Sequence, residues 1–175
     1  LLLKPYVDHY PYDLSNQFCG DETYIRVNGK WHYLFFFFDA VKKIILSYPV
    51  SPNRDAVAAI RAIDEVLVKM QEIPEDLTLV VDGNPIYLLA QHFFAQHNIN
   101  FDVKQVIGLT NEDPVSTEFR PLKQVIERLN RTFKGNYRST HGFGSEQGSV
   151  SYVTLFVTYF NFLRPHASLE GKVPV

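Results

Sequence analysis

The spacing of apolar residues changes its period near residue 51. Before that point, two strand-like segments, Asp21–Val27 and Trp31–Asp39, flank Asn28-Gly29. This dipeptide supplies the positive φ angles that a two-residue hairpin turn requires. A third strand is predicted over Ile44–Val50, so three antiparallel strands follow one another closely. A strand meander that gives way to helices restricts the chain to a small set of α/β folds.

Downstream of residue 51, helical and strand-like patterns alternate. Apolar residues recur at three- and four-residue steps in the helical segments, and short continuous apolar runs mark buried strands. In chain order we predict a helix from Ser51-Pro52 to Pro74, a strand over Leu77–Val81, a helix over Ile86–Gln96, a strand over Phe101–Val106, a polar loop over 108–118, and helices over Arg120–Lys134 and Ser149–Leu163. The predicted fold class is α/β and ribonuclease H-like, with a mixed five-stranded sheet flanked by helices. Its first three strands are antiparallel and its last two are parallel.

Length and composition exclude several classes of protein. The 175 residues suffice for one domain with a buried core. The single cysteine, Cys19, cannot form an internal disulfide, which excludes a disulfide-built secreted scaffold. No uncharged apolar run approaches the ~18 residues of a membrane helix, so we expect no membrane partner. We expect residues 1–19 to be an extended lead-in or linker and residues 20–175 to be the functional core.

The net charge of −2 conceals an uneven distribution. Residues 1–118 carry 9 basic and 16 acidic side chains, a net charge of −7. Residues 119–175 carry 8 basic and 3 acidic side chains, a net charge of +5. Nucleic-acid binding needs a basic surface, and the last third of the chain can supply one.

Three acidic residues stand where ribonuclease H-like folds place site carboxylates. Asp21 opens the first predicted strand, Asp82 follows the fourth, and Glu127 lies within the helix predicted over Arg120–Lys134. Mg²⁺ binds through few carboxylates and completes its shell with water and substrate phosphates. Two such ions can clamp the attacking and leaving oxygens of a phosphoryl transfer. We therefore predict a site for two Mg²⁺ ions, with Mn²⁺ as a substitute.

Four segments, in this order, carry a resemblance to a known family. They are Gly20–Tyr33, Val80–Tyr87, Ile126–Lys134 and Tyr159–Leu169. Together they resemble the catalytic core of bacterial insertion-sequence transposases of the DDE type, within the wider retroviral-integrase superfamily. The resemblance implies Mg²⁺-dependent phosphodiester cleavage and strand transfer of a mobile element. It also implies a location in the bacterial cytoplasm, in association with the nucleoid.

By position, the resemblance implies that Asp21, Asp82 and Glu127 are the catalytic carboxylates and metal ligands. Lys134 lies seven residues, about two helical turns, after Glu127 and matches a basic residue common in these cores. Asp82 and Glu127 are separated by 44 residues, a longer spacing than the family often has. We therefore expect an insertion, most simply in the loop 108–118. Recognition of the element ends is expected to need segments outside this core.

Basic and amide side chains cluster on and after the helix of Glu127. We predict that this set contacts DNA phosphates: Lys123, Arg128, Asn130, Arg131, Lys134 and Arg138. The alternative is an ordinary solvated helix face. The predicted partners are the element ends and the target DNA, and joining two ends favours a homo-oligomer on DNA. The resemblance gives Arg164-Pro165-His166 no clear chemical role.

Each carboxylate also has a purely structural interpretation, and Asp21 could be an ordinary charge at the edge of a strand. Asp82 could be a turn residue, because Asp-Gly-Asn-Pro is typical turn chemistry. Glu127 could pair with Arg131 or Lys123 one turn away on a solvated face. Glu22 adjoins Asp21, but neighbouring strand residues point to opposite faces, so we do not expect it in the site.

Other acidic residues compete for the third position. Asp39 ends the second strand and is expected to be structural or to lie behind the site. Glu112 and Glu118 precede the helix of Glu127 and are the alternatives to it. Two other functions also stay open: a ribonuclease H-like nuclease that only hydrolyses, and a non-catalytic DNA-binding relic.

Overall fold

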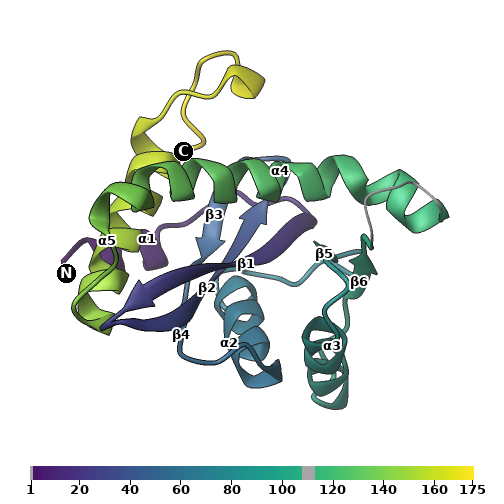
Figure 1. Cartoon of the computed structure of the whole chain (residues 1–175). Helices are drawn as coiled ribbons and strands as arrows, with labels where there is room; N and C mark the ends of the chain where they lie inside the picture. Colours follow the sequence, from purple (N-terminus) through teal and green to yellow (C-terminus); the bar gives the residue numbers. More distant parts are fainter. Residues whose placement is uncertain (1, 108–112) are drawn as a thin grey trace.

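A mixed sheet with helices on both faces forms the molecule (Figure 1). The computed structural model describes residues 2–107 and 113–175. The strands are β1 (Gln17–Val27), β2 (Lys30–Asp39), β3 (Ile44–Ser47), β4 (Val50–Ser51), β5 (Thr78–Val81) and β6 (Asp102–Gln105). The α-helices are α1 (Leu3–His9), α2 (Ala56–Leu67), α3 (Ile86–Gln96), α4 (Pro114–Tyr137) and α5 (Glu146–Thr158). Short 3₁₀ turns follow at Arg138–Thr140 and Ala167–Leu169, and a π-helical turn extends α5 over Tyr159–Leu163.

The strand order is β3-β2-β1-β5-β6, with β4 paired to β2. β1, β2 and β3 are antiparallel, whereas β1, β5 and β6 are parallel. This arrangement confirms the predicted fold class. The predicted third strand is divided into β3 and β4 at Tyr48-Pro49, because proline has no N–H to donate to the ladder.

The hairpin turn between β1 and β2 forms as its sequence predicts. Asn28 and Gly29 have φ angles of 50° and 73°, and Val27 pairs with Lys30 across the turn. Positive φ at both central residues gives the turn a twist that matches the flanking strands. The turn therefore fixes the register of the long ribbon that carries Asp21.

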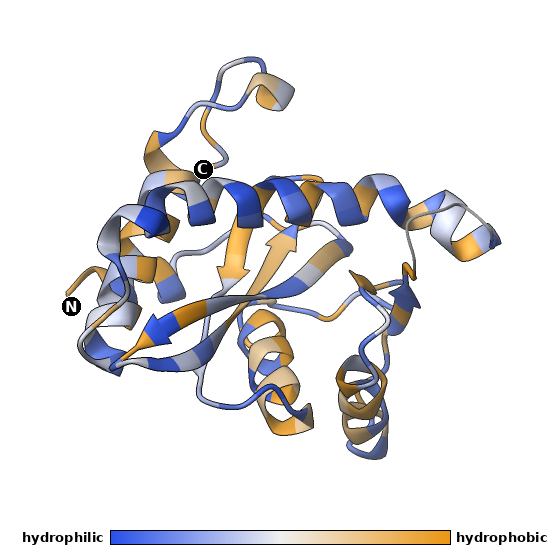
Figure 2. Ribbon diagram, in the orientation of Figure 1, coloured by the Kyte–Doolittle hydropathy of each residue, from blue (hydrophilic) through white to orange (hydrophobic). Residues whose placement is uncertain are grey.

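The aromatic run in β2 contributes side chains to both layers of the core. Phe36 and Phe38 pack beneath α4 and α5, whereas Phe35 and Phe37 pack against α2 and α3. Because strand side chains alternate between faces, a continuous apolar run indicates a strand that is covered on both sides. Figure 2 shows the hydrophobic residues along β2 and β3, and their alternation with hydrophilic residues along α4.

Two helices begin at other residues than predicted, because a capping side chain determines where each one starts. α2 begins at Ala56 and not at Ser51-Pro52, because the Asp55 side chain accepts a hydrogen bond from the Ala58 N–H. α4 begins at Pro114 and not at Arg120, because Asp113 caps Ser116 in the same way. Residues 113–118 of the predicted loop thus belong to the cap and first turns of α4. The rest of that loop, 108–112, including Glu112, lies outside the described residues.

The predicted extended lead-in over residues 1–19 is wrong in its conformation. Residues Leu3–His9 form α1, which packs against α5, and β1 begins within the same segment, at Gln17. Tyr6 of α1 and Tyr10, the residue directly after this helix, contact Phe162, with ring centroids 6.1 and 5.1 Å away. These long-range contacts stabilise a helix whose own sequence shows little periodicity.

None of the helices in the described part of the chain has the length and apolarity needed to span a membrane.

Candidate catalytic site

Asp21 and Asp82 meet where the pairing between β1 and β5 ends. The parallel ladder runs from Gln17↔Thr78 to Cys19↔Val80. Beyond Cys19 the edge of β1 is no longer paired to β5, and Asp82 leaves β5 directly after Val81. Ligands of α/β sheets commonly bind at such carboxyl ends of parallel strands. The sheet therefore brings together two carboxylates that are 61 positions apart in the sequence.

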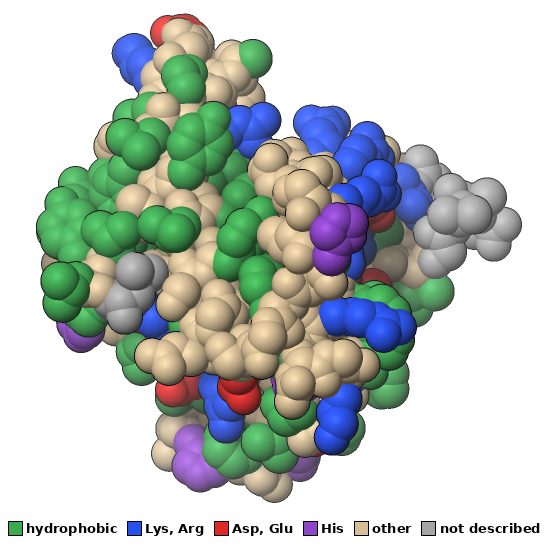
Figure 3. All heavy atoms as spheres, turned by 60° about the vertical axis from the view of Figure 1, so that its left-hand side comes forward, with side chains coloured by type: hydrophobic (Ala, Val, Ile, Leu, Met, Phe, Trp, Pro, Cys, Tyr) green, Lys and Arg blue, Asp and Glu red, His purple; other side chains and the backbone are tan. Residues whose placement is uncertain are grey.

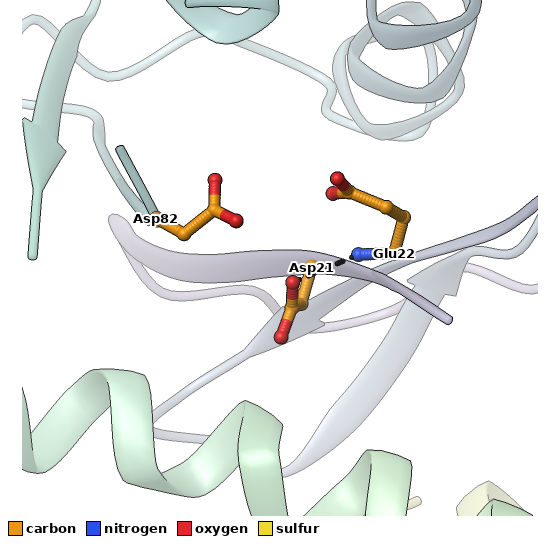
Figure 4. A group of neighbouring side chains, drawn as sticks. All are labelled: Asp21, Glu22 and Asp82. Carbon is orange, nitrogen blue, oxygen red and sulfur yellow. Dashed lines mark hydrogen bonds between the residues drawn. The ribbon is translucent and has the colours of Figure 1, made fainter. Parts of the chain in front are cut away.

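A third carboxylate joins them. One oxygen each from Asp21, Glu22 and Asp82 lie within 4.8 Å of one another. Figure 4 shows the Asp21 carboxylate on the side of β1 that faces α4, and those of Glu22 and Asp82 on the other side. Glu22 points to the face of β1 opposite that of Asp21, as expected, but this does not keep it out of the carboxylate group. Its carboxylate still reaches the group because the edge of β1 is open at this point.

Buried polar partners hold the Glu22 side chain, which belongs to a residue only 8% exposed. Arg54 donates from Nε at 2.5 Å, the Tyr87 hydroxyl donates to Oε2, and Asn84 donates from Nδ2 at 3.3 Å. Burial, and then the Glu22 charge, raises the pKa of Tyr87 well above its usual value, so this phenol remains a donor.

The same groups tie the loop after β5 in place. The Asn84 backbone N–H donates to the Asp82 carboxylate at 2.9 Å, while its side-chain amide reaches Glu22. Arg54 also lies 3.9 Å from the Asp82 carboxylate. Asp82 is therefore a turn residue, as its alternative interpretation has it, and also a member of the acidic group.

Two side chains of α4 contact Asp21. The Lys123 ammonium lies 3.0 Å from its carboxylate, and Asn130 Nδ2 donates to it at 3.2 Å. Burial raises the pKa of Asp21; Lys123 acts against this, whereas the Glu22 and Asp82 charges add to it. Lys123 is only 6% exposed and is the cation paired with Asp21.

Glu127 lies on the same side of α4 as these two contacts. It comes four residues after Lys123 and three before Asn130, so the three positions share one helix face. Glu127 is exposed, and it does not belong to the carboxylate group found among the described residues. Within residues 2–107 and 113–175, no ion pair joins it to Lys123 or Arg131.

The chemistry of these donors fits a divalent cation. Three carboxylates supply the hard oxygen ligands that Mg²⁺ prefers. The Asn130 Oδ1 atom, beside Asp21, is buried and has no hydrogen-bond partner among the described residues. A buried acceptor without a donor is costly, and a cation bound at Asp21 would remove that cost.

The predicted DNA-contacting set divides into two groups. Arg128, Arg131 and Arg138 are exposed. Lys123 and Asn130 are engaged with Asp21, and Lys134 donates to the Tyr24 backbone carbonyl. The first group is free to contact phosphate, whereas the second group ties α4 to β1 beside the carboxylates.

Of the competing carboxylates, the two within the described residues do not belong to this group. Asp39 is fully buried and accepts hydrogen bonds from Ser15, Val41 and Lys42, so it holds the turn after β2. Glu118 is exposed in the first turns of α4 and is not part of the acidic group.

Sequence reasoning missed Glu22, Arg54 and Tyr87. The position of Glu22 next to Asp21 could have indicated its membership, because the pairing of β1 with β5 ends just before these two residues. Arg54 and Tyr87 carry no local signal, because their roles arise from contacts 32 and 65 positions away along the chain.

Residues 15–147 of the sequence match a family model described as a DDE domain. This span covers more than half of the chain. A search of curated proteins finds no match.

Comparison with solved structures finds similar folds. The HTLV-2 integrase catalytic core domain in complex with magnesium has a TM-score of 0.62 and 16% identity, over 92% of this chain and 95% of that one. The catalytic core domain of BIV integrase has a TM-score of 0.59 and 16% identity, over 91% of both chains. A chain of the simian T-cell lymphotropic virus intasome, solved with the B56 gamma subunit of PP2A, has a TM-score of 0.59 and 16% identity, over 87% of this chain. The present chain spans about half of that one, 51%. At such identities the likeness establishes a common fold.

Proposed function

Since this chain belongs to the DDE domain family, as a transposase or integrase core of the polynucleotidyl transferase class, we propose that it cleaves DNA at the ends of a mobile element and transfers the freed strands to a target. The observation that carries the proposal is the convergence of Asp21, Glu22 and Asp82 at the open edge of β1, opposite the Glu127 face of α4. Residues 20–175 would form this core, with α1 packed against it.

We propose that Asp21, Asp82 and Glu127 hold two Mg²⁺ ions, or Mn²⁺ in their place. When bound, the ions would polarise the attacking oxygen and neutralise the leaving oxygen. Asp21 and Asp82 are held by Asn130 and Asn84, so their carboxylates are oriented before a substrate arrives. The exposed Glu127 would turn toward them once a cation offsets the repulsion among the acids.

The proposed reaction is two in-line displacements at phosphorus. In the first, the oxygen of water bonds to phosphorus, the bond to the 3′ oxygen breaks, and that oxygen leaves as a 3′-hydroxyl. In the second, this 3′ oxygen bonds to a target phosphorus and displaces a target 3′ oxygen. Each step exchanges one P–O bond for another, so positioning and charge are what the protein must supply.

DNA would lie over the exposed Arg128, Arg131 and Arg138, whose guanidiniums suit phosphate oxygens. Joining two element ends favours a homo-oligomer on DNA. We further propose a bacterial protein that works beside the nucleoid. The resemblance of four segments to insertion-sequence transposases supports this origin.

A strand-transfer assay with pre-cleaved ends tests the proposal. The wild-type chain, with Mg²⁺ and the flanking segments needed for end recognition, should join labelled ends to a target duplex. Asp82→Asn should abolish joining, because an amide lacks the charge that holds the cation. The matched control is Asp64→Asn, an exposed residue of α2 on the other layer, which should retain full activity.

The outcomes separate the three candidate functions. Hydrolysis without any joined product would identify a nuclease. If Mn²⁺ does not bind at millimolar concentration and Asp82→Asn changes no activity, the chain is a non-catalytic relic.

A further inference from the structure

A pocket of about 370 Å³ lies between α4, the turn before β3 and the segment that follows α5. Its polar lining comes from all three places: Lys43, Arg128, Arg131, Thr132, Arg164, His166 and Ser168. Arg164 and His166 belong to the Arg-Pro-His motif that the proposed reaction does not use. Figure 3 shows Lys and Arg side chains gathered near the top of one face of the molecule.

This pocket concentrates positive charge. Among the described residues that line it, none is acidic. Across residues 2–107 and 113–175, none of its four Lys and Arg side chains pairs with a carboxylate. Burial, and the nearby Arg128 charge, lowers the pKa of Lys43, although Cys19 and Asp39 act against this. Burial, and then the Arg164 and Lys43 charges, lowers the pKa of His166. Cations held this close without a counterion favour an anionic ligand.

The pocket has a fixed apolar floor. Phe38, Leu129 and Phe160 line it and are buried in the core. Arg164 lies over the Phe160 ring, 5.5 Å from its centroid, and the His166 ring contacts the same ring at 4.5 Å. Aromatic contacts orient both side chains, and an apolar floor strengthens the attraction of an anion to the cations above it.

Its position relates it to the catalytic site. Leu129 and Val125 line the pocket, whereas Lys123, Glu127 and Asn130 lie on the face of α4 toward Asp21. The pocket and the acidic group are thus on opposite flanks of one helix, which with its side chains is about 10 Å across. Arg131 lies between them on the exposed side.

We propose that this pocket binds a phosphate group in the backbone of the DNA whose scissile bond lies at Asp21 and Asp82. The inference rests on the proposed function and adds a second anchor for the same strand. Arg128 and Arg164 offer planar donors for phosphate oxygens, and Ser168 adds a hydroxyl. DNA is favoured over other anions because the pocket shares α4 with the catalytic face. Such a contact positions the duplex without reading its sequence.

The salt dependence of DNA binding tests this anchor. Affinity of the full-length protein for an end duplex is measured in EDTA, so that no chemistry occurs, over a range of KCl concentrations. The double variant Lys43→Gln/Arg164→Gln should reduce the slope of log K against log[KCl] by about 2, since each lost phosphate contact removes about 1. Arg61→Gln, an exposed arginine on α2, should leave the slope unchanged.

A second variant tests the pocket without the risk that the double variant misfolds. Ser168→Asp changes an exposed residue at the pocket and should weaken DNA binding at least tenfold at low salt, with an unchanged Tm. Unchanged slopes and affinities in both variants would overturn the inference.

Two further measurements show whether the pocket binds free phosphate instead of DNA, and whether the proposed function itself fails. If inorganic phosphate raises the Tm of the wild type but not of the double variant, while DNA slopes stay equal, the pocket takes free phosphate and the DNA anchor is wrong. Strand transfer by the wild type in the same preparation tests the proposed function separately. Its loss with an intact slope difference would leave the anchor standing.

Discussion

At the scale of single residues, Glu22 shows how a buried acid is retained beside two others. A buried carboxylate is costly unless it is paired and hydrogen-bonded. Arg54 supplies the charge, and Tyr87 and Asn84 supply two further donors. Asn84 also donates to Asp82, so Glu22 positions the loop that holds a proposed metal ligand.

Glu22→Gln tests this positioning role. The substitution keeps the size of the side chain but removes the charge that pairs with Arg54 and places an amide against Asn84. We expect the apparent Mg²⁺ affinity in strand transfer to fall about 10–100-fold, as for other groups that orient metal ligands. Glu72→Gln, at an exposed position, is the matched control. An unchanged Mg²⁺ midpoint would show that Glu22 does not act through the metal site.

At the scale of elements, the pairing of β1 with β2 depends on a glycine. Gly20 pairs with Phe37, and a Cβ at this position would come 2.6 Å from the Cζ atom of the Phe37 ring. Phe37 is fully buried between the sheet and α2 and α3, so the ring has no room to move. The close approach of β1 to this ring therefore requires glycine immediately before Asp21.

Two glycine substitutions with opposite expected signs test this requirement. Gly20→Ala should lower the free energy of unfolding by about 1–3 kcal/mol, the usual cost of overpacking a core. Gly135→Ala, at an exposed position of α4 with open space around it, should raise it by about 0.5–1 kcal/mol. Urea unfolding measures both. A neutral or stabilising Gly20→Ala would contradict the proposed contact.

Helix α1 is joined to the core through Asp8. Its carboxylate accepts from Lys4 at 2.8 Å and from the Tyr48 hydroxyl at 2.5 Å, and Lys69 lies 3.5 Å away. Burial alone would raise the pKa of Asp8, but the hydrogen bonds from Lys4 and Tyr48 and the charge of Lys69 lower it overall. The ionised form is therefore the one that stabilises the fold.

Asp8→Asn should destabilise the protein by about 1–3 kcal/mol at pH 7, because buried donors lose a charged acceptor. The folded pKa lies below the unfolded value, so this contribution is present above the unfolded pKa and is lost as the pH falls through the folded one. Wild type and variant should hence become equally stable in acid, by chemical denaturation at several pH values. Asp13→Asn, which removes an exposed pair with Lys42, should change little at any pH. A difference between wild type and Asp8→Asn that persists at low pH would rule out the charge as its cause.

At the scale of the whole molecule, the uneven charge of the sequence becomes a difference between layers. The basic segment after residue 119 builds most of α4 and the C-terminal segment on one face of the sheet, whereas α2 and α3 on the other face belong to the acidic segment. A net charge of −2 is therefore compatible with DNA on the α4 face alone.

Mg²⁺ should stabilise the folded chain as a whole. A ligand that binds only the native state adds about 2.7 kcal/mol at a hundredfold excess over its Kd. We expect Mg²⁺ to raise the Tm beyond the effect of KCl at equal ionic strength. Asp82→Asn should abolish the rise and Asp64→Asn should keep it. An equal rise in all three proteins would place the bound ions elsewhere.

Much of the fold could be predicted because its signals are local. The Asn28-Gly29 turn, the aromatic run of β2 and the span of α3 each follow from neighbouring residues. The position of Asp82 at the carboxyl end of a parallel strand, and that of Asp21 on the first long strand, follow from those elements. The assignment of Glu127 as the third ligand stays a prediction, and the helix face that it shares with Lys123 and Asn130 supports it.

The sequence by itself thus determined the order of the elements from β1 onward and the strand ends at which Asp21 and Asp82 meet, because backbone periodicity and turn chemistry act over a few residues. Only the tertiary structure decided that Glu22 joins the group, that Lys123 neutralises Asp21, and that Arg164 and Lys43 share a pocket. Each of these depends on where strand pairing stops or on which distant side chain fills a space. Such contacts are set by packing across the whole molecule, and no local pattern encodes them.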